Sequence, residues 1–167
     1  MTGAYNFENI CAALCIGQFF GVQELRAIEA LEAYQPENNR SQILRKGSNL
    51  IFMDAYNANP TSMSLSLKNF AAKSGINIAI MGDMFELGED AEKEHAAIGE
   101  LTNELQLDQV IFCGELMRYA SLSNPKGKYF VKKADLRMYL KDQPIQNANI
   151  LIKGSRGMSL ETLLDVL

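Results

Sequence analysis

The sequence predicts an α/β domain with a doubly wound, mostly parallel sheet, preceded by a helical hairpin. From residue 41 onward, short apolar runs typical of strands alternate with segments of helical periodicity. Two of these runs, at residues 76–82 (INIAIMG) and 148–154 (ANILIKG), are apolar nearly throughout. Strands covered on both faces of a parallel sheet have this pattern, whereas half-exposed strands alternate.

The length and composition set the scale of the molecule. The 167 residues suffice for one domain of ~150 residues plus an appendage. With 47% hydrophobic and 22% charged residues, the chain has the composition of a folded globular protein and not of a disordered one. The formal net charge of -4 offers no basic surface for nucleic acid or an anionic membrane, so neither is an expected partner.

The three cysteines and the longest apolar run indicate a cytoplasmic protein. Cys11, Cys15 and Cys113 show no CxxC spacing, so the sequence suggests neither a disulfide framework nor a zinc site. The uncharged run at 10–22 is shorter than the ~20 residues needed to span a bilayer, and no Lys or Arg precedes it as in a signal peptide. We interpret it as a buried helix, with Cys11 and Cys15 packed in a core.

The elements follow in order along the chain. Helical spacing predicts helices over 6–20 and 22–34, with a turn at Gly21. The polar, proline-bearing stretch 35–40 predicts a boundary between units 1–35 and 36–167. Strands are expected at 41–46, 50–54, 76–81, 110–113, 128–131 and 150–153, and further helices after Pro60, up to Leu105, and near Leu116, Leu136 and Leu160.

The turns after the strands are the expected functional sites, because ligands of such sheets bind beyond the carboxyl ends of the strands. In the first turn, residues 54–60, Asn59 and Pro60 predict the N-cap and first residue of a helix. Asp54 and the asparagines of this turn suit a ribose, a base edge or a phosphate. A self-contained Asx turn explains the same residues equally well.

The second turn, residues 82–90, is acidic. Asp83 and Glu86 suit an ammonium group or a metal ion, whereas Glu89 and Asp90 favour the start of the next helix. His95, the only histidine, lies within that helix and has no sequence partner for metal binding or a triad. We therefore interpret it as a packing or solvent-facing residue.

The third turn, residues 153–157 (KGSRG), has the composition of an anion cradle. Its glycines allow backbone N–H groups to converge on a carboxylate or phosphate, and Lys153 and Arg156 add positive charge. The alternative is that Arg156 is merely solvated. No GxxxxGK[ST] motif occurs in the sequence, so the chain has no recognisable loop for an ATP triphosphate of its own.

Taken together, DAYNANPTSM, GDMFELGED…EH and LIKGSRGM resemble the C-terminal part of the Mur ligases, and GAYNFENICAAL resembles the last helical unit of their central ATPase domain. The resemblance covers nearly the whole chain. It implies a Rossmann-like C-terminal domain in residues 36–167 and a fragment of the ATPase domain in residues 1–35.

The resemblance also implies a function in peptidoglycan precursor synthesis, and hence in cell-wall biogenesis, cell shape and division. It is strongest to members that use ATP, with Mg²⁺, to add D-Ala-D-Ala to UDP-N-acetylmuramoyl-tripeptide in the cytoplasm. A different Mur or folylpolyglutamate-type ligase, or a stand-alone nucleotide or amino-acid binding module, remains the alternative. We expect a monomer that is inactive without the rest of the ligase.

The resemblance assigns site residues position by position. It implies no catalytic residue and no metal ligand within this chain. The nucleotide side comprises Asn6, Asn9, Arg40, Asp54, Tyr56, Asn57 and Asn59, with Arg40 a hinge residue that reaches the phosphates when the domains close. The D-Ala-D-Ala side comprises Asp83, Glu86, Lys153, Ser155 and Arg156.

Overall fold

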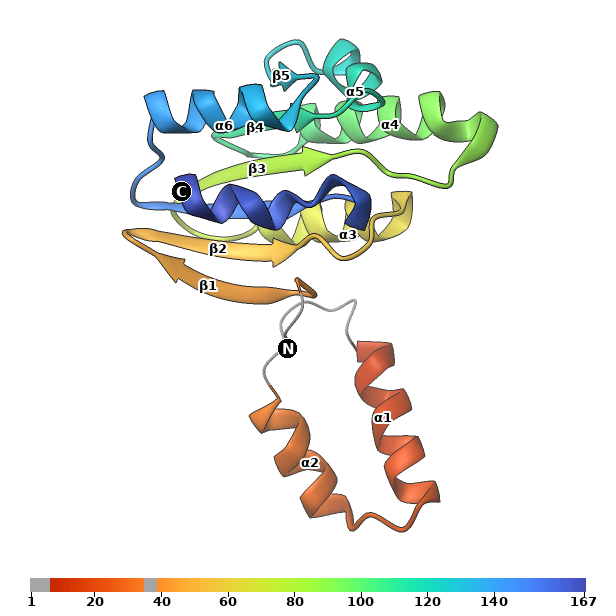
Figure 1. Cartoon of the computed structure of the whole chain (residues 1–167). Helices are drawn as coiled ribbons and strands as arrows, with labels where there is room; N and C mark the ends of the chain where they lie inside the picture. Colours follow the sequence, from red (N-terminus) through yellow and green to blue (C-terminus); the bar gives the residue numbers. More distant parts are fainter. Residues whose placement is uncertain (1–6, 35–38) are drawn as a thin grey trace.

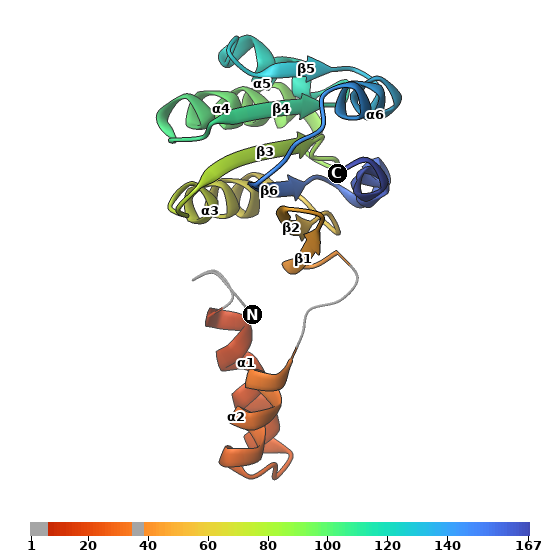
Figure 2. The same cartoon turned by 90° about the vertical axis from the view of Figure 1, so that its left-hand side faces the viewer.

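The computed structural model describes residues 7–34 and 39–167, which form a helical hairpin followed by a six-stranded α/β domain (Figure 1). Helices α1 (Phe7–Phe19) and α2 (Glu24–Ala33) lie side by side and reverse direction at Gly21, which has a φ of 76°. The hairpin projects from the β1 side of the sheet (Figures 1 and 2).

The hairpin corrects one expectation from the sequence. No residue of either helix is buried, and Phe7, Phe19 and Leu25 are each at least 67% exposed. Cys15 is exposed and Cys11 only partly covered, so neither packs in a core. Both helices carry the expected apolar side chains. The two short helices cover these side chains only in part, and the sheet does not cover the remaining ones.

The sheet has the strand order β1-β2-β6-β3-β4-β5. Only β1 runs antiparallel, because it joins β2 through a tight turn containing Gly47, whose φ is 56°. The strands are β1 (Gln42–Lys46), β2 (Asn49–Asp54), β3 (Ile76–Gly82), β4 (Gln109–Cys113), β5 (Lys128–Phe130) and β6 (Ala148–Lys153). The last strand in sequence therefore lies between β2 and β3, in the middle of the sheet.

Helices cover both faces, as Figure 2 shows edge-on, and each face has its own core. One face carries α3 (Pro60–Ala71), α4 (Ala91–Glu104) and α5 (Met117–Ser123), and the other carries α6 (Lys133–Asp142) and the C-terminal segment. Along β3, Ile78 and Ile80 point to the second face and Ala79 and Met81 to the first. The predicted doubly wound α/β fold is confirmed.

Two details differ from the predicted elements. The C-terminal helix expected near Leu160 is formed by short 3₁₀ helices, η3 (Arg156–Met158) and η4 (Leu160–Val166), and a further one, η2 (Gly88–Asp90), precedes α4. Strand β5 ends at Phe130, one residue early. Among the described helices, none has the length and apolar character needed to cross a bilayer.

Candidate functional site

The three turns singled out in the sequence meet at one edge of the sheet. The first follows β2, the third follows β6 and the second follows β3, and these strands are neighbours in the order β2-β6-β3 with parallel pairing. Residues from distant parts of the sequence are therefore adjacent: Asp54 pairs in register with Lys153, and Met81 pairs with Lys153 on the other side.

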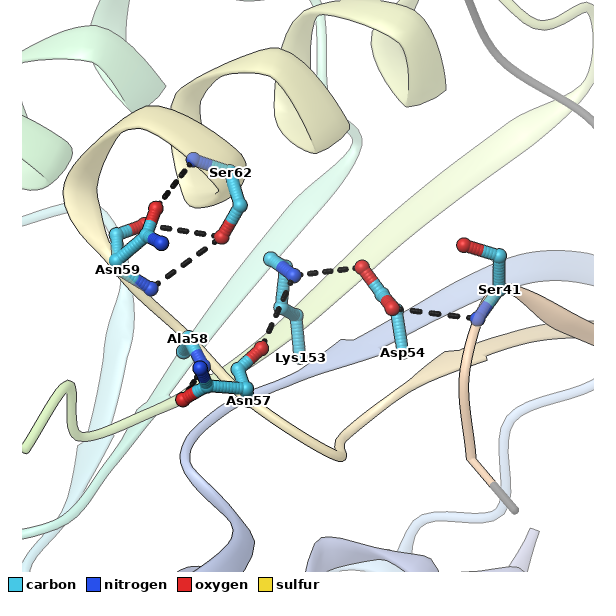
Figure 3. Close-up of polar contacts among 7 residues, drawn as sticks. All are labelled: Ser41, Asp54, Asn57, Ala58, Asn59, Ser62 and Lys153. Carbon is cyan, nitrogen blue, oxygen red and sulfur yellow. Dashed lines mark hydrogen bonds and ion pairs between the residues drawn. The ribbon is translucent and has the colours of Figure 1, made fainter. Parts of the chain in front are cut away.

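A buried ion pair joins the first and third turns (Figure 3). Lys153 is 2% exposed, and its Nζ lies 2.6 Å from Asp54 Oδ2. The same ammonium donates to the Asn57 carbonyl oxygen at 3.4 Å, while Asp54 Oδ1 accepts the Ser41 N–H at 3.2 Å. Two residues that the resemblance assigns to different substrates thus bind each other, and both oxygens of Asp54 are engaged.

The asparagines of the first turn shape the turn itself. Asn59 caps α3: its Oδ1 accepts the Ser62 N–H at 2.8 Å, and Ser62 Oγ accepts the Asn59 N–H at 3.3 Å. Asn57 Oδ1 accepts the Ala58 N–H at 2.9 Å. The N-cap and helix-opening Pro60 predicted from the sequence are confirmed. The turn is satisfied internally, and the exposed side chains of both asparagines still face solvent.

Arg40 stacks on Tyr56, with its guanidinium carbon 3.6 Å from the centre of the ring. Both side chains are exposed, Tyr56 to 41%. The neighbours of Arg40 have left-handed backbones, with φ of 61° at Asn39 and 46° at Ser41. Non-glycine residues adopt this conformation at a cost, and such strain concentrates at functional sites. The structure thus brings together two residues assigned to the nucleotide.

Asp83 of the second turn is buried against the start of α5. Its Oδ1 accepts the Met117 N–H at 2.8 Å, and a Cβ at Gly114, whose φ is 128°, would lie 2.3 Å from that oxygen. Burial raises the pKa of the Asp83 carboxyl above 3.8, and the hydrogen bonds from the backbone N–H groups of residues 115–117 partly oppose this rise. The carboxyl group faces the protein interior and holds the loop.

His95 and Ser155 hold the rest of the second turn. His95 is fully buried, its Nε2 accepts the Met84 N–H at 3.0 Å, and its Nδ1 lies 2.6 Å from the Ala91 carbonyl oxygen. This arrangement fits the neutral imidazole with the proton on Nδ1. Ser155 Oγ accepts the Phe85 N–H at 2.9 Å, and the Ser155 N–H donates to the Asp83 carbonyl oxygen at 2.9 Å. His95 is a packing residue, one of the two roles expected.

Glu86 and Arg156 are exposed charged residues of the second and third turns. Glu86 is exposed and has a φ of 66°, the left-handed region. The Arg156 side chain is 56% exposed, and its Nη1 lies 2.7 Å from Glu161 Oε1. The second oxygen of Glu161 is buried without a hydrogen-bond partner among the described residues. Glu161 was not singled out in the sequence, although it follows the third turn by only four residues.

Three further predictions concern residues outside these turns. Asn9 lies in α1 of the hairpin, and Asn6 falls outside the described residues. Burial raises the pKa of the Cys113 thiol at the end of β4 to about 11, so this thiol is protonated at neutral pH. Within residues 7–34 and 39–167, no three His, Cys, Asp or Glu side chains gather as a metal site would require.

The sequence and the fold match one family of known proteins. Residues 39–156 match the family model described as Mur ligase, glutamate ligase domain. The chain belongs to this family. The UDP-N-acetylmuramoyl-tripeptide--D-alanyl-D-alanine ligase of Escherichia coli is 30% identical to this Mur ligase chain over 171 residues, which cover all of it and 38% of the Escherichia coli protein.

Solved structures of Mur ligases share the fold. MurF from Acinetobacter baumannii has a TM-score of 0.88 and 32% identity, and MurF ligase from Thermotoga maritima in complex with ADP has a TM-score of 0.81 and 25% identity. Both comparisons cover 99% of this chain and 38% of the solved one. The chain therefore spans less than two fifths of the length of these relatives.

Proposed function

We propose that this chain is the C-terminal portion of an ATP-dependent ligase that adds D-Ala-D-Ala to UDP-N-acetylmuramoyl-tripeptide in the cytoplasm. The observation that carries the proposal is the similarity to such a ligase of Escherichia coli over the whole chain, at 30% identity. The clustering of the three turns at one sheet edge supports it, because ligands of doubly wound sheets bind there.

The nucleotide is assigned to the first turn and the residues before β1. The exposed guanidinium of Arg40, resting on Tyr56, is a suitable partner for phosphate oxygens, and Arg binds phosphate with paired N–H groups. The side chain of Asp54 is 17% exposed. It can bind a ribose hydroxyl only while it keeps its present partners. A relative solved with ADP is consistent with a nucleotide-binding function.

The dipeptide is assigned to the second and third turns. D-Ala-D-Ala carries a carboxylate and an ammonium group, and the exposed Arg156 and Glu86 have the complementary charges. Ser155 and Asp83 keep the two turns in register. In the ligation, the activated carboxyl of the tripeptide is attacked by the dipeptide amine and phosphate leaves. The chain contributes by holding that amine close, a proximity effect.

The rest of the ligase supplies what the described residues do not. They contain no cluster of acidic or histidine side chains for Mg²⁺, so we place this ion outside them. Residues 1–35 are assigned to the end of the ATPase domain. Their exposed apolar side chains, including Phe7, Phe19 and Leu25, support this, because a surface of that kind is normally covered by further protein.

The test is phosphate release by the ligase that carries this chain, with ATP, UDP-N-acetylmuramoyl-tripeptide and alternative acceptors. We expect D-Ala-D-Ala to support release and glutamate, D-Ala and diaminopimelate to fail. A preference for one of those acceptors would assign a different ligase. The isolated chain should release no phosphate with any acceptor, and release by it would contradict the proposed division of the site.

Arg40→Ala sharpens the test. It removes the exposed cation beside Tyr56 and should raise the KM for ATP by about tenfold, the value of one charge-assisted contact, without changing the KM for the dipeptide. Lys141→Ala, an exposed cation at the end of α6, is the matched control and should change neither KM.

A further inference from the structure

We propose that Lys153 is a positioning residue for the nucleotide side of the site, and not a ligand of the dipeptide carboxylate. The inference rests on the proposed function and changes the role that the family resemblance gives to this residue. It follows from where the Lys153 ammonium lies, from what that ammonium holds in place, and from the presence of a second, exposed cation in the same turn.

The Lys153 ammonium is withdrawn from the surface. The side chain is 2% exposed, and its Nζ lies 2.6 Å from Asp54 Oδ2 and 3.4 Å from the Asn57 carbonyl oxygen. To reach a dipeptide carboxylate, the ammonium would have to leave Asp54 without its charge partner in a mostly buried position. Breaking a buried pair in this way is strongly unfavourable. Exchanging the Asp54 carboxylate for that of the dipeptide therefore gives no gain in binding free energy.

The pair connects the third turn to the segment that carries Arg40. Asp54 uses its other oxygen to accept the Ser41 N–H at 3.2 Å, and Ser41 directly follows Arg40. On the opposite side, Lys153 holds the carbonyl of Asn57, the residue after Tyr56, on which Arg40 stacks. Lys153 therefore fixes both supports of the Arg40 guanidinium, one through Asp54 and one through the first turn. Figure 3 shows the contacts of Lys153 with Asp54 and Asn57, and the bond from Ser41 to Asp54.

The backbone around Arg40 needs such support. Asn39 and Ser41 both have positive φ, at 61° and 46°, which a chain without tertiary contacts rarely adopts. Loss of the ammonium would leave Asp54 free to turn to solvent and release the Ser41 N–H. Arg40 would then sample many positions, and a nucleotide would have to order it again on binding.

Arg156 provides the contrast within the same turn. Its side chain is 56% exposed and its guanidinium is held at one end by Glu161. A dipeptide carboxylate can approach this cation without breaking a buried pair. The third turn thus contains one cation that faces a substrate and one that faces the protein.

The experiment compares Lys153→Met and Arg156→Met in the ligase that carries this chain, with Lys141→Met as the matched control. We expect Lys153→Met to raise the KM for ATP by about tenfold or more and to leave the KM for D-Ala-D-Ala within about twofold. Arg156→Met should do the reverse, and Lys141→Met should change neither. A raised dipeptide KM with an unchanged ATP KM in Lys153→Met would overturn the inference.

A double substitution tests whether Lys153 acts through Asp54. Asp54→Asn should raise the KM for ATP by itself, and Asp54→Asn with Lys153→Met should be no worse than the stronger single variant, because the two residues act as one unit. Independent effects that multiply would contradict action through the pair. If Lys153→Met does not fold, Asp54→Asn still tests the nucleotide assignment through the two KM values.

A measurement on the isolated chain separates this inference from the proposed function. Lys153→Met should increase hydrogen exchange at the Ser41 amide by about tenfold, while Arg156→Met leaves it unchanged. An unchanged Ser41 amide in Lys153→Met would contradict the inference without reference to any substrate. If instead the wild-type ligase ignores D-Ala-D-Ala, the proposed function fails and the exchange result still stands.

Discussion

The first and second turns leave the same edge of the sheet, but different forces hold them. The first is held by charge, since Lys153 pairs with Asp54, and by the exposed capping bonds between Asn59 and Ser62 at the start of α3. The second is held by buried hydrogen bonds from its backbone to His95 and Ser155, and by the Asp83 carboxyl on α5. The first turn is therefore open to exchange with solvent and ligands, whereas Asp83 and Met84 at the start of the second belong to the core.

The comparison predicts that substitutions around the second turn cost more stability than those around the first. The largest effect is expected for Gly114→Ala. Its φ of 128° suits glycine, and the added Cβ would lie 2.3 Å from Asp83 Oδ1. We expect a loss of about 3 kcal/mol in the free energy of unfolding, as for a crowded core position, measured by urea denaturation. Gly47→Ala, where a Cβ meets nothing within 4 Å, is the control that separates backbone strain from collision.

His95→Ala comes next. It leaves the buried Met84 N–H without an acceptor and a hole in the core, and should cost about 2 kcal/mol in the free energy of unfolding. His95→Gln, which offers a carbonyl oxygen, should recover part of the loss. If Lys93→Ala, on the exposed side of the same helix, costs as much, the effect belongs to the helix and not to the turn.

Asn59→Ala tests the first turn. It removes the N-cap of α3 and should lower the free energy of unfolding by about 1 kcal/mol, the usual value of one cap, in the same denaturation assay. Asp at this position caps equally well, so Asn59→Asp should be close to wild type. A loss larger than that of His95→Ala would reverse the order proposed for the two turns.

The smallest effect is a pH dependence at Asp83. Because burial raises the folded-state pKa of this carboxyl above 3.8, the folded protein binds the proton more tightly than the unfolded chain. Its contribution to stability is therefore fully present below pH 3.8 and is lost as pH rises through the folded-state pKa. As the pH increases through this pKa, the free energy of unfolding of the wild type should decrease relative to that of Asp83→Asn. A relative stability that increases with pH would show that the bonds to α5 outweigh burial.

Local signals in the sequence account for most of the elements and for the first turn. The apolar runs that become β3 and β6 are buried almost throughout, and Asn59 with Pro60 opens α3 as expected. The helical period also located the hairpin but not its environment. Phe7 and Phe19 are apolar residues with helical spacing, yet both are exposed, because spacing does not say whether another surface is present to cover them.

Sequence alone determined the fold class and the three turns, since each depends on residues that are close together along the chain. It also indicated the family, since several short motifs follow one another in the family's order. The tertiary structure alone decided which turns touch. Insertion of β6 between β2 and β3 places Lys153 against Asp54, 99 residues away, and Ser155 against Phe85, 70 residues away. Burial then determines what those groups do: a lysine that the sequence marks as a ligand for an anion already has its anion in the folded protein, because an ammonium removed from water requires one.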